Sequence, residues 1–314
     1  MMRFFRAVHA LVGLAAGTAL LLASPADASF PGRNGDIAFW IADIDDLLGD
    51  YVNGVHVGLV SPNGARRRFI ARGLDPAFSP NGRTLAISAE APWGIVLRRL
   101  DGARIRRLTN SNDHAPAWSP SGRRIAFSRL HCVEAEVDYA PPDCESRGIY
   151  TIGRDAEGQR LLVEDGLEPA WSRSGRIAFV RSSDPYRLGG VGTGDGGIHV
   201  VPSGGGVPRE LVRSGFSPDW SPSGDRLVFL RKTGRNKALF VVNANGTGLR
   251  RLHVTGNHLA SPIWAPNGRS IAFLEDYEAF TISPSGKDRR RLLRFPCGPC
   301  GVEGGDGLAW QPRP

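Results

Sequence analysis

The 314-residue sequence lacks the short motifs that mark three common classes of enzyme. It contains no Gly-x-Ser-x-Gly, the turn that presents the nucleophile of α/β-hydrolases. It contains no His-Glu-x-x-His, the helical zinc-binding motif of metalloproteases. The glycine-rich stretch 189–197 lacks the Lys-Ser/Thr pair of a phosphate-binding loop. These absences speak against hydrolase, metalloprotease and nucleotide-binding functions.

Long hydrophobic runs are also rare, and the one at the N-terminus has the features of a signal peptide. Two arginines precede the apolar stretch 7–22, and Ala26-Asp27-Ala28 follows as a cleavage site. The stretch is short for a membrane-spanning helix. No cysteine stands near the cleavage site for lipid attachment. We therefore expect residues 1–28 to be a signal peptide and the mature protein to be periplasmic or extracellular, with no transmembrane span.

Cysteine is scarce, with four residues: Cys132, Cys144, Cys297 and Cys300. In an oxidising compartment an even number favours disulfides. Cys132 and Cys144 are at the two ends of one predicted loop, so they are the simplest pair, which leaves Cys297 to pair with Cys300. Cys-Gly-Pro-Cys is also the redox motif of thioredoxins, but its βαβ setting is absent here. Zinc binding with His131 is another alternative, and the sequence leaves the connectivity open.

What the sequence does contain is a repeated phrase close to Pro-x-Trp-Ser-Pro-x-Gly-Arg-x-Ile-Ala-Phe. The aromatic residues of its six copies are Phe78, Trp118, Trp171, Trp220, Trp264 and Trp310. Proline suits the start of a strand, Ser-Pro-x-Gly forms a hairpin turn, and Ile-Ala-Phe continues as a second strand. A third strand and an outer strand are predicted in every blade, and several of the outer strands are rich in arginine. A repeat of about 40 to 50 residues with four strands predicts an all-β, six-bladed propeller.

The two ends of the chain share one predicted blade. The sixth copy stops after 308–312, and the missing half of the motif occurs near the N-terminus as 34–39. We expect the C-terminal strand to be the innermost strand of the blade whose other strands come from the N-terminus. This arrangement closes the ring and leaves fewer unpaired strand edges. Residues 29–314 then form a single propeller domain.

The formal net charge of +8 comes from arginine spread along the chain, as in Arg66-Arg67-Arg68 and Arg289-Arg290-Arg291. A nucleic-acid-binding surface would gather such charges on one face with aromatic residues between them. Here they fall in or near predicted outer strands, where charge prevents edge-to-edge pairing. The pattern favours a solvated rim, with attraction to an acidic envelope polymer or an anionic lipid surface as the alternative.

The repeats resemble those of TolB-type β-propellers, which read roughly Pro-x-Trp-Ser-Pro-Asp-Gly-x-x-Ile-Ala-Phe. Arg107-Leu108-Thr109 matches the Arg-Leu-Thr that typically ends the outer strand of that family. The family's turn aspartate is replaced by Asn81, Ser121, Ser174, Ser223 and Asn267. In TolB a small α/β domain precedes the propeller, whereas these repeats begin soon after Ala28. The resemblance implies a propeller that receives partners at one mouth of its channel, although similar repeats also occur in prolyl-oligopeptidase-like hydrolases.

The residues just before each inner strand are expected to ring that mouth. At the position before the first proline they are Asp75, Ala115, Glu168, Ser217 and Ser261, and His114, His258 and Asp306 lie close by in the sequence. Acidic and imidazole groups around a concave mouth suit a cation, a sugar or a basic peptide end. Alternatively they satisfy backbone donors at the strand ends. Asp75, His114, Glu168 and Asp306 are our candidate binding residues.

We therefore expect an exported, monomeric, non-enzymatic scaffold that binds a protein or cell-envelope partner at this mouth, without a cofactor, a metal or nucleic acid. The alternative is a metal-dependent or sugar-processing propeller enzyme. That enzyme would use Asp75, His114 and Glu168 around a metal ion in the channel.

Overall fold

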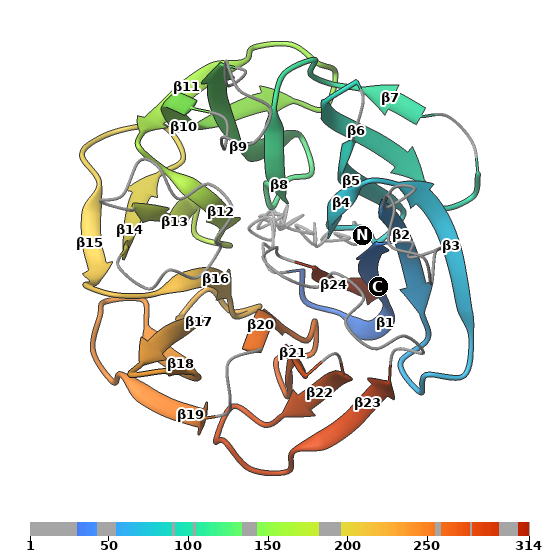
Figure 1. Ribbon diagram of the computed structural model, residues 1–314, viewed down its shortest axis with the longest axis vertical. Helices are drawn as coiled ribbons and strands as arrows, with labels where there is room; N and C mark the ends of the chain where they lie inside the picture. Colours follow the sequence, from blue (N-terminus) through green and yellow to red (C-terminus); the bar gives the residue numbers. More distant parts are fainter. Residues whose placement is uncertain are drawn as a thin grey trace, which may run out of the picture.

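The fold is a ring of six antiparallel sheets around a central channel (Figure 1). The computed structural model describes residues 30–42, 55–89, 92–102, 105–133, 143–181, 196–254, 259–276, 278–294 and 307–313. Each sheet has four strands, and the described residues contain no helix. The predicted six-bladed, all-β propeller is therefore confirmed. Predictions for residues 1–28, His258, Cys297, Cys300 and Asp306 fall outside the described residues.

The strands are numbered along the chain, and each blade runs from the channel outward. The innermost strands of blades 1 to 6 are β24 (Leu308–Arg313), β4 (Leu74–Phe78), β8 (Asp113–Trp118), β12 (Leu167–Trp171), β16 (Phe216–Trp220) and β20 (Leu259–Trp264). The second strands are β1 (Arg33–Ala42), β5 (Thr84–Ala89), β9 (Arg124–Val133), β13 (Arg176–Arg181), β17 (Arg226–Thr233) and β21 (Ile271–Glu275). The third strands are β2 (Val55–Val60), β6 (Gly94–Arg99), β10 (Asp143–Gly153), β14 (Gly197–Pro202), β18 (Asn236–Asn243) and β22 (Glu278–Ile282). The outermost strands are β3 (Arg67–Arg72), β7 (Ile105–Arg107), β11 (Arg160–Glu164), β15 (Arg209–Val212), β19 (Arg250–Val254) and β23 (Arg290–Arg294).

The ring closes in blade 1, where strands from both ends of the chain pair. Trp310 in β24 lies opposite Ile37 in β1, and the sheet continues through β2 to β3. The Gln311 amide donates to the carbonyl of Gly82 in the next blade at 2.8 Å. Arg313 forms an ion pair with Asp36 at 3.1 Å. The predicted exchange of strands between the two ends is confirmed, and β24 is the innermost strand of blade 1, next to the channel (Figure 1).

The core lies between neighbouring blades, because each inner-strand aromatic packs beside the sheet of the preceding blade. Trp220 is fully buried in a cluster that includes Ala178 and Ile198 of blade 4. The indole of Trp118 donates to the carbonyl of Ala77 at 3.0 Å, and that of Trp220 donates to the carbonyl of Ala170 at 3.2 Å. Trp118 and Trp220 therefore hold adjacent blades together through both apolar burial and a hydrogen bond, whereas the buried indole N–H groups of Trp171 and Trp264 have no hydrogen-bond partner among the described residues.

The two channel faces differ in their loops, because strands within a blade alternate in direction. The Ser-Pro-x-Gly turns join the first and second strands on one face, named here the turn face. The loops between the second and third strands, and the connections to the next blade, lie on the opposite face. The inner strands begin there, so it is named the mouth face. Within the described residues, no helix is long and apolar enough to cross a membrane.

The backbone brings the first pair of cysteines together. Cys132 in β9 lies directly opposite Cys144 in β10. Residues opposite each other in an antiparallel pair have Cα atoms about 4.5 to 5.5 Å apart, which is within the range that a disulfide spans. We predict that protein made in an oxidising compartment yields a Cys132–Cys144 peptide in non-reducing peptide mapping. A crosslink from Cys132 to Cys297 or Cys300 instead would contradict this pairing.

Candidate functional site

The residue before the first proline has an unusual backbone conformation in five blades. The five residues have positive φ values between 47° and 53°, and they are Asp75, Ala115, Glu168, Ser217 and Ser261. Each lies in a β-bulge where the inner strand shifts register against its neighbour. Gly307 precedes β24 at the equivalent place in blade 1. Left-handed conformations cost about 1 kcal/mol or more for residues other than glycine, so other contacts must hold them.

Hydrogen bonds to the next blade provide those contacts. Asp75 Oδ2 accepts the backbone N–H of Ala115 in the next blade at 3.1 Å, and the hydroxyl of Ser88 in its own blade at 3.1 Å. Glu168 Oε2 accepts the N–H of Ser217 at 2.5 Å. The bulge thus turns these side chains along the ring, where they tie successive blades together.

The same linkage continues at two other junctions of the ring. Ser261 Oγ accepts the N–H of Gly307 at 2.8 Å and so joins blade 6 to blade 1. Ala115 has no polar side chain, and at its junction the hydroxyl of Ser128 accepts the N–H of Glu168 at 3.0 Å. Asp75 and Glu168, two of the acidic residues predicted at the mouth, therefore accept backbone N–H groups at the start of the next inner strand.

Asp75 also approaches His114 at the mouth. The imidazole Nδ1 lies 4.0 Å from Asp75 Oδ2, and its Nε2 lies 2.5 Å from Asn112 Oδ1. Burial raises the pKa of Asp75 above 3.8, while the nearby imidazole and the two hydrogen bonds act in the opposite direction. The ring of Trp93, which is 46% exposed, lies 6.0 Å from that of His114. The structure thus joins two predicted site residues, Asp75 and His114, to an exposed tryptophan that was not predicted.

Replacing Asp75 by asparagine separates the charge of this side chain from its hydrogen bonds. Because the pKa is raised in the folded protein, ionisation costs stability as the pH rises above 3.8. The Asp75→Asn variant should match the wild type near pH 4 and be more stable at pH 7, as measured by urea unfolding. Asp75→Ala should be less stable by about 1 to 3 kcal/mol, because the Ala115 N–H loses its acceptor. An asparagine variant as unstable as the alanine variant would contradict this account.

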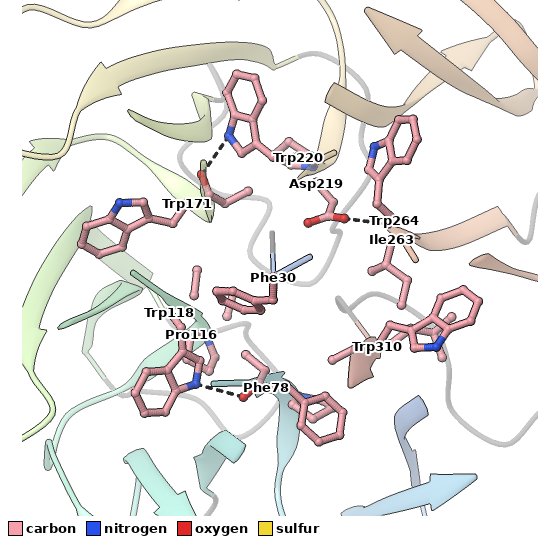
Figure 2. Close-up of a pocket in the computed structure, with 18 of the residues that line it drawn as sticks. Phe30, Phe78, Pro116, Trp118, Trp171, Asp219, Trp220, Ile263, Trp264 and Trp310 are labelled. Atoms are coloured by element: carbon pink, nitrogen blue, oxygen red, sulfur yellow. Dashed lines mark hydrogen bonds between the residues drawn. The ribbon is translucent and has the colours of Figure 1, made fainter. Parts of the chain in front are cut away.

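The channel itself is lined mainly by small and apolar residues. The residue between the proline and the aromatic of each repeat contributes to the wall, and these residues are Ala77, Ala117, Ala170, Asp219, Ile263 and Ala309. They leave a cavity of about 160 Å³. Figure 2 shows Phe30 in the middle of this ring, with the tryptophans pointing away from it.

Neither Phe30 nor Asp219 was predicted from the sequence to line the channel. Asp219 interrupts a position that is alanine in four of the six copies, and that departure was a visible signal. Its carboxylate accepts the backbone N–H of Trp264 at 2.7 Å. Nothing in the repeat marks Phe30. In the part of the chain that the structure describes, no group of three or more His, Cys, Asp or Glu side chains is placed to hold a metal ion.

Comparisons with known proteins agree with this architecture. No family model matches the sequence. A curated TolB homologue from Chlorobium luteolum is 30% identical over 159 residues, which are 48% of this chain and only 31% of that protein. The crystal structure of TolB from Acinetobacter baumannii has a TM-score of 0.66 at 18% identity, covering 89% of this chain and 67% of that one.

Enzymes share the fold as well. The structure of an oligogalacturonate lyase in complex with manganese has a TM-score of 0.52 at 11% identity, covering 76% of this chain and 71% of that one. At such identities the structural similarity shows the fold alone. In its repeated motif, and in its six-bladed ring closed by the C-terminal strand, this chain is similar to TolB-type β-propellers.

Proposed function

We propose that this protein is an exported, non-enzymatic scaffold that binds a protein partner on its mouth face. The observation that carries the proposal is Trp93, a large aromatic side chain that is 46% exposed beside the mouth. The Arg107 guanidinium donates to the Trp93 carbonyl at 3.2 Å, and His114 flanks the ring. Tryptophan and arginine are enriched among the residues that dominate protein–protein binding energy. An exposed tryptophan that is held in place suits such an anchor.

The contacts of the carboxylates favour a scaffold over an enzyme. The alternative, a metal-dependent or sugar-processing propeller, needs Asp75, His114 and Glu168 to face a common substrate. Asp75 and Glu168 instead accept backbone N–H groups of the following blades. The sequence similarity to a TolB homologue supports a partner-binding role, whereas the similarities to the solved structures concern the fold. Export is proposed from the composition of residues 1–28.

A photo-crosslinking amino acid at position 93 tests where the partner binds. Trp93 lies in the connection between β5 and β6 on the mouth face, whereas Val207, which is 91% exposed, lies between β14 and β15 on the turn face. Position 207 is therefore a matched control. In cells, position 93 should form a discrete crosslink to a periplasmic or extracellular protein, and position 207 should not. Equal labelling from both positions would overturn the proposal.

The contribution of Trp93 to affinity is a quantitative prediction. Truncating a tryptophan that acts as a binding anchor typically costs about 2 kcal/mol or more, which is roughly a 30-fold increase in Kd. We expect Trp93→Ala to weaken binding of the crosslinked partner by at least that factor in isothermal titration calorimetry. Val207→Ala should leave the Kd unchanged. Equal affinity of the Trp93→Ala and wild-type proteins would show that the partner binds elsewhere.

A further inference from the structure

One residue that lines the central cavity, Phe30, does not belong to the repeated motif. Phe30 lies in the channel, half-buried, and packs against the cluster that contains Trp118 and Ala77 (Figure 2). Figure 2 also shows Asp219 and Ile263 projecting toward Phe30 from two neighbouring blades. The cavity of about 160 Å³ is lined by residues of all six inner strands together with Phe30.

The segment that carries Phe30 reaches the channel from the turn face. The Gly32 N–H donates to the carbonyl of Pro266 at 3.3 Å, and Asn34 Oδ1 accepts the N–H of Asn267 at 3.2 Å. Both partners belong to the turn that joins β20 to β21. A Cβ atom on Gly32 would lie 2.4 Å from the carbonyl oxygen of Arg313, so the chain passes too close to β24 for any side chain there. These contacts make Phe30 a fixed part of the channel wall.

The cavity reaches both faces of the ring. Asp75 and Ala115 line it on the mouth side, and Pro222 and Pro266 line it on the turn side. Phe30 enters from the turn side and lies among these lining residues, so it narrows the channel below the mouth. The proposed partner on the mouth face therefore binds over this cavity.

The size and chemistry of the pocket indicate what it accepts. An enclosed apolar protein cavity of about 150 Å³ holds a benzene ring, and this cavity, which is open and has polar as well as apolar lining, has a similar volume of about 160 Å³. Five buried prolines line the cavity: Pro76, Pro116, Pro169, Pro218 and Pro262. Proline restricts the backbone, so the wall loses little conformational freedom when a ligand binds. Asp219 places a carboxylate in the wall of the cavity. Its negative charge disfavours the binding of a ligand group that is also negatively charged.

We propose that the channel is an anchor pocket for a single aromatic side chain of the partner, with Phe30 in its wall. The proposal rests on partner binding at the mouth face, and it names the chemistry of the group inserted there. Rigid apolar pockets that bury one aromatic anchor are a common source of interface affinity.

N-acetyl-phenylalanine amide is a suitable probe, because it carries the ring without a net charge. N-acetyl-alanine amide and N-acetyl-aspartate amide are the matched controls. In saturation-transfer NMR the aromatic amide should bind the wild-type protein, and neither control should bind at the same concentration. Ala117→Leu, which fills the channel from β8, should abolish binding. Phe30→Trp, which enlarges a residue of the wall, should weaken binding at least 10-fold, and this second variant lies outside the strands.

The outcomes separate this proposal from the proposed function. Thermal unfolding of each variant first establishes that it is folded. Absence of binding to the wild-type protein, or binding that both filling variants leave unchanged, would overturn the anchor pocket. Partner binding that depends on Trp93 but not on Ala117→Leu would overturn the pocket and leave the partner site intact. Aromatic binding lost in the filling variants, together with a weaker partner Kd, would support both.

Discussion

A chain that ends at Gly307 is expected to lose its cooperative thermal unfolding transition. Such a chain lacks β24, which carries the buried residues Leu308 and Trp310 and pairs with β1. Losing a buried tryptophan alone costs about 3 to 5 kcal/mol, and the lost strand pairing adds to this cost. The total stability of a domain is typically only about 5 to 15 kcal/mol. Circular dichroism during heating should show a broad transition or none.

The matched control retains the strand and removes only one surface interaction. Arg313→Ala deletes the ion pair with Asp36, in which the arginine side chain is 49% exposed. Exposed pairs contribute about 0 to 1 kcal/mol, so this variant should unfold within a few degrees of the wild type. If the chain ending at Gly307 also unfolds cooperatively near the wild-type temperature, closure by β24 is not needed for stability.

The second large loss of stability is expected for the Trp220→Ala variant. Trp220 has no exposed surface, packs between blades 4 and 5, and donates to the carbonyl of Ala170. The guanidinium of Arg176 also lies over its ring, 5.2 Å from the centroid. Removing the ring leaves a cavity, so we expect a loss of about 3 to 5 kcal/mol in the free energy of unfolding. Guanidinium chloride denaturation followed by circular dichroism measures this change.

Trp93→Ala is the matched control, since it removes the same side chain from a position that is 46% exposed. Surface substitutions usually change stability by less than about 0.5 kcal/mol. Trp220→Phe should fall between the two, because it keeps an apolar ring and loses the hydrogen bond to Ala170. Similar losses for Trp93→Ala and Trp220→Ala would contradict the view that inter-blade tryptophans hold the ring together.

The candidate site was only partly predictable from the sequence. The repeat alignment identified Asp75 and Glu168 as residues that precede the inner strands. It did not show that a bulge turns their side chains toward the next blade, where they accept N–H groups. A left-handed residue before proline is unusual for a strand, so the local pattern contained no reason to expect it. Trp93 lies outside the motif, and its position beside His114 depends on two different blades.

The six blades, their four strands and the closure by the C-terminal strand could be predicted from the sequence, because they follow from local patterns repeated along the chain. The contents of the channel and the directions of the mouth side chains became visible only in the folded ring. Phe30 reaches the channel through contacts of its segment with Pro266 and Arg313. These residues are far from it in sequence and come close only when the ring closes. Short segments that repeat along the chain therefore specify the blades, whereas the pocket forms only when the ring has assembled.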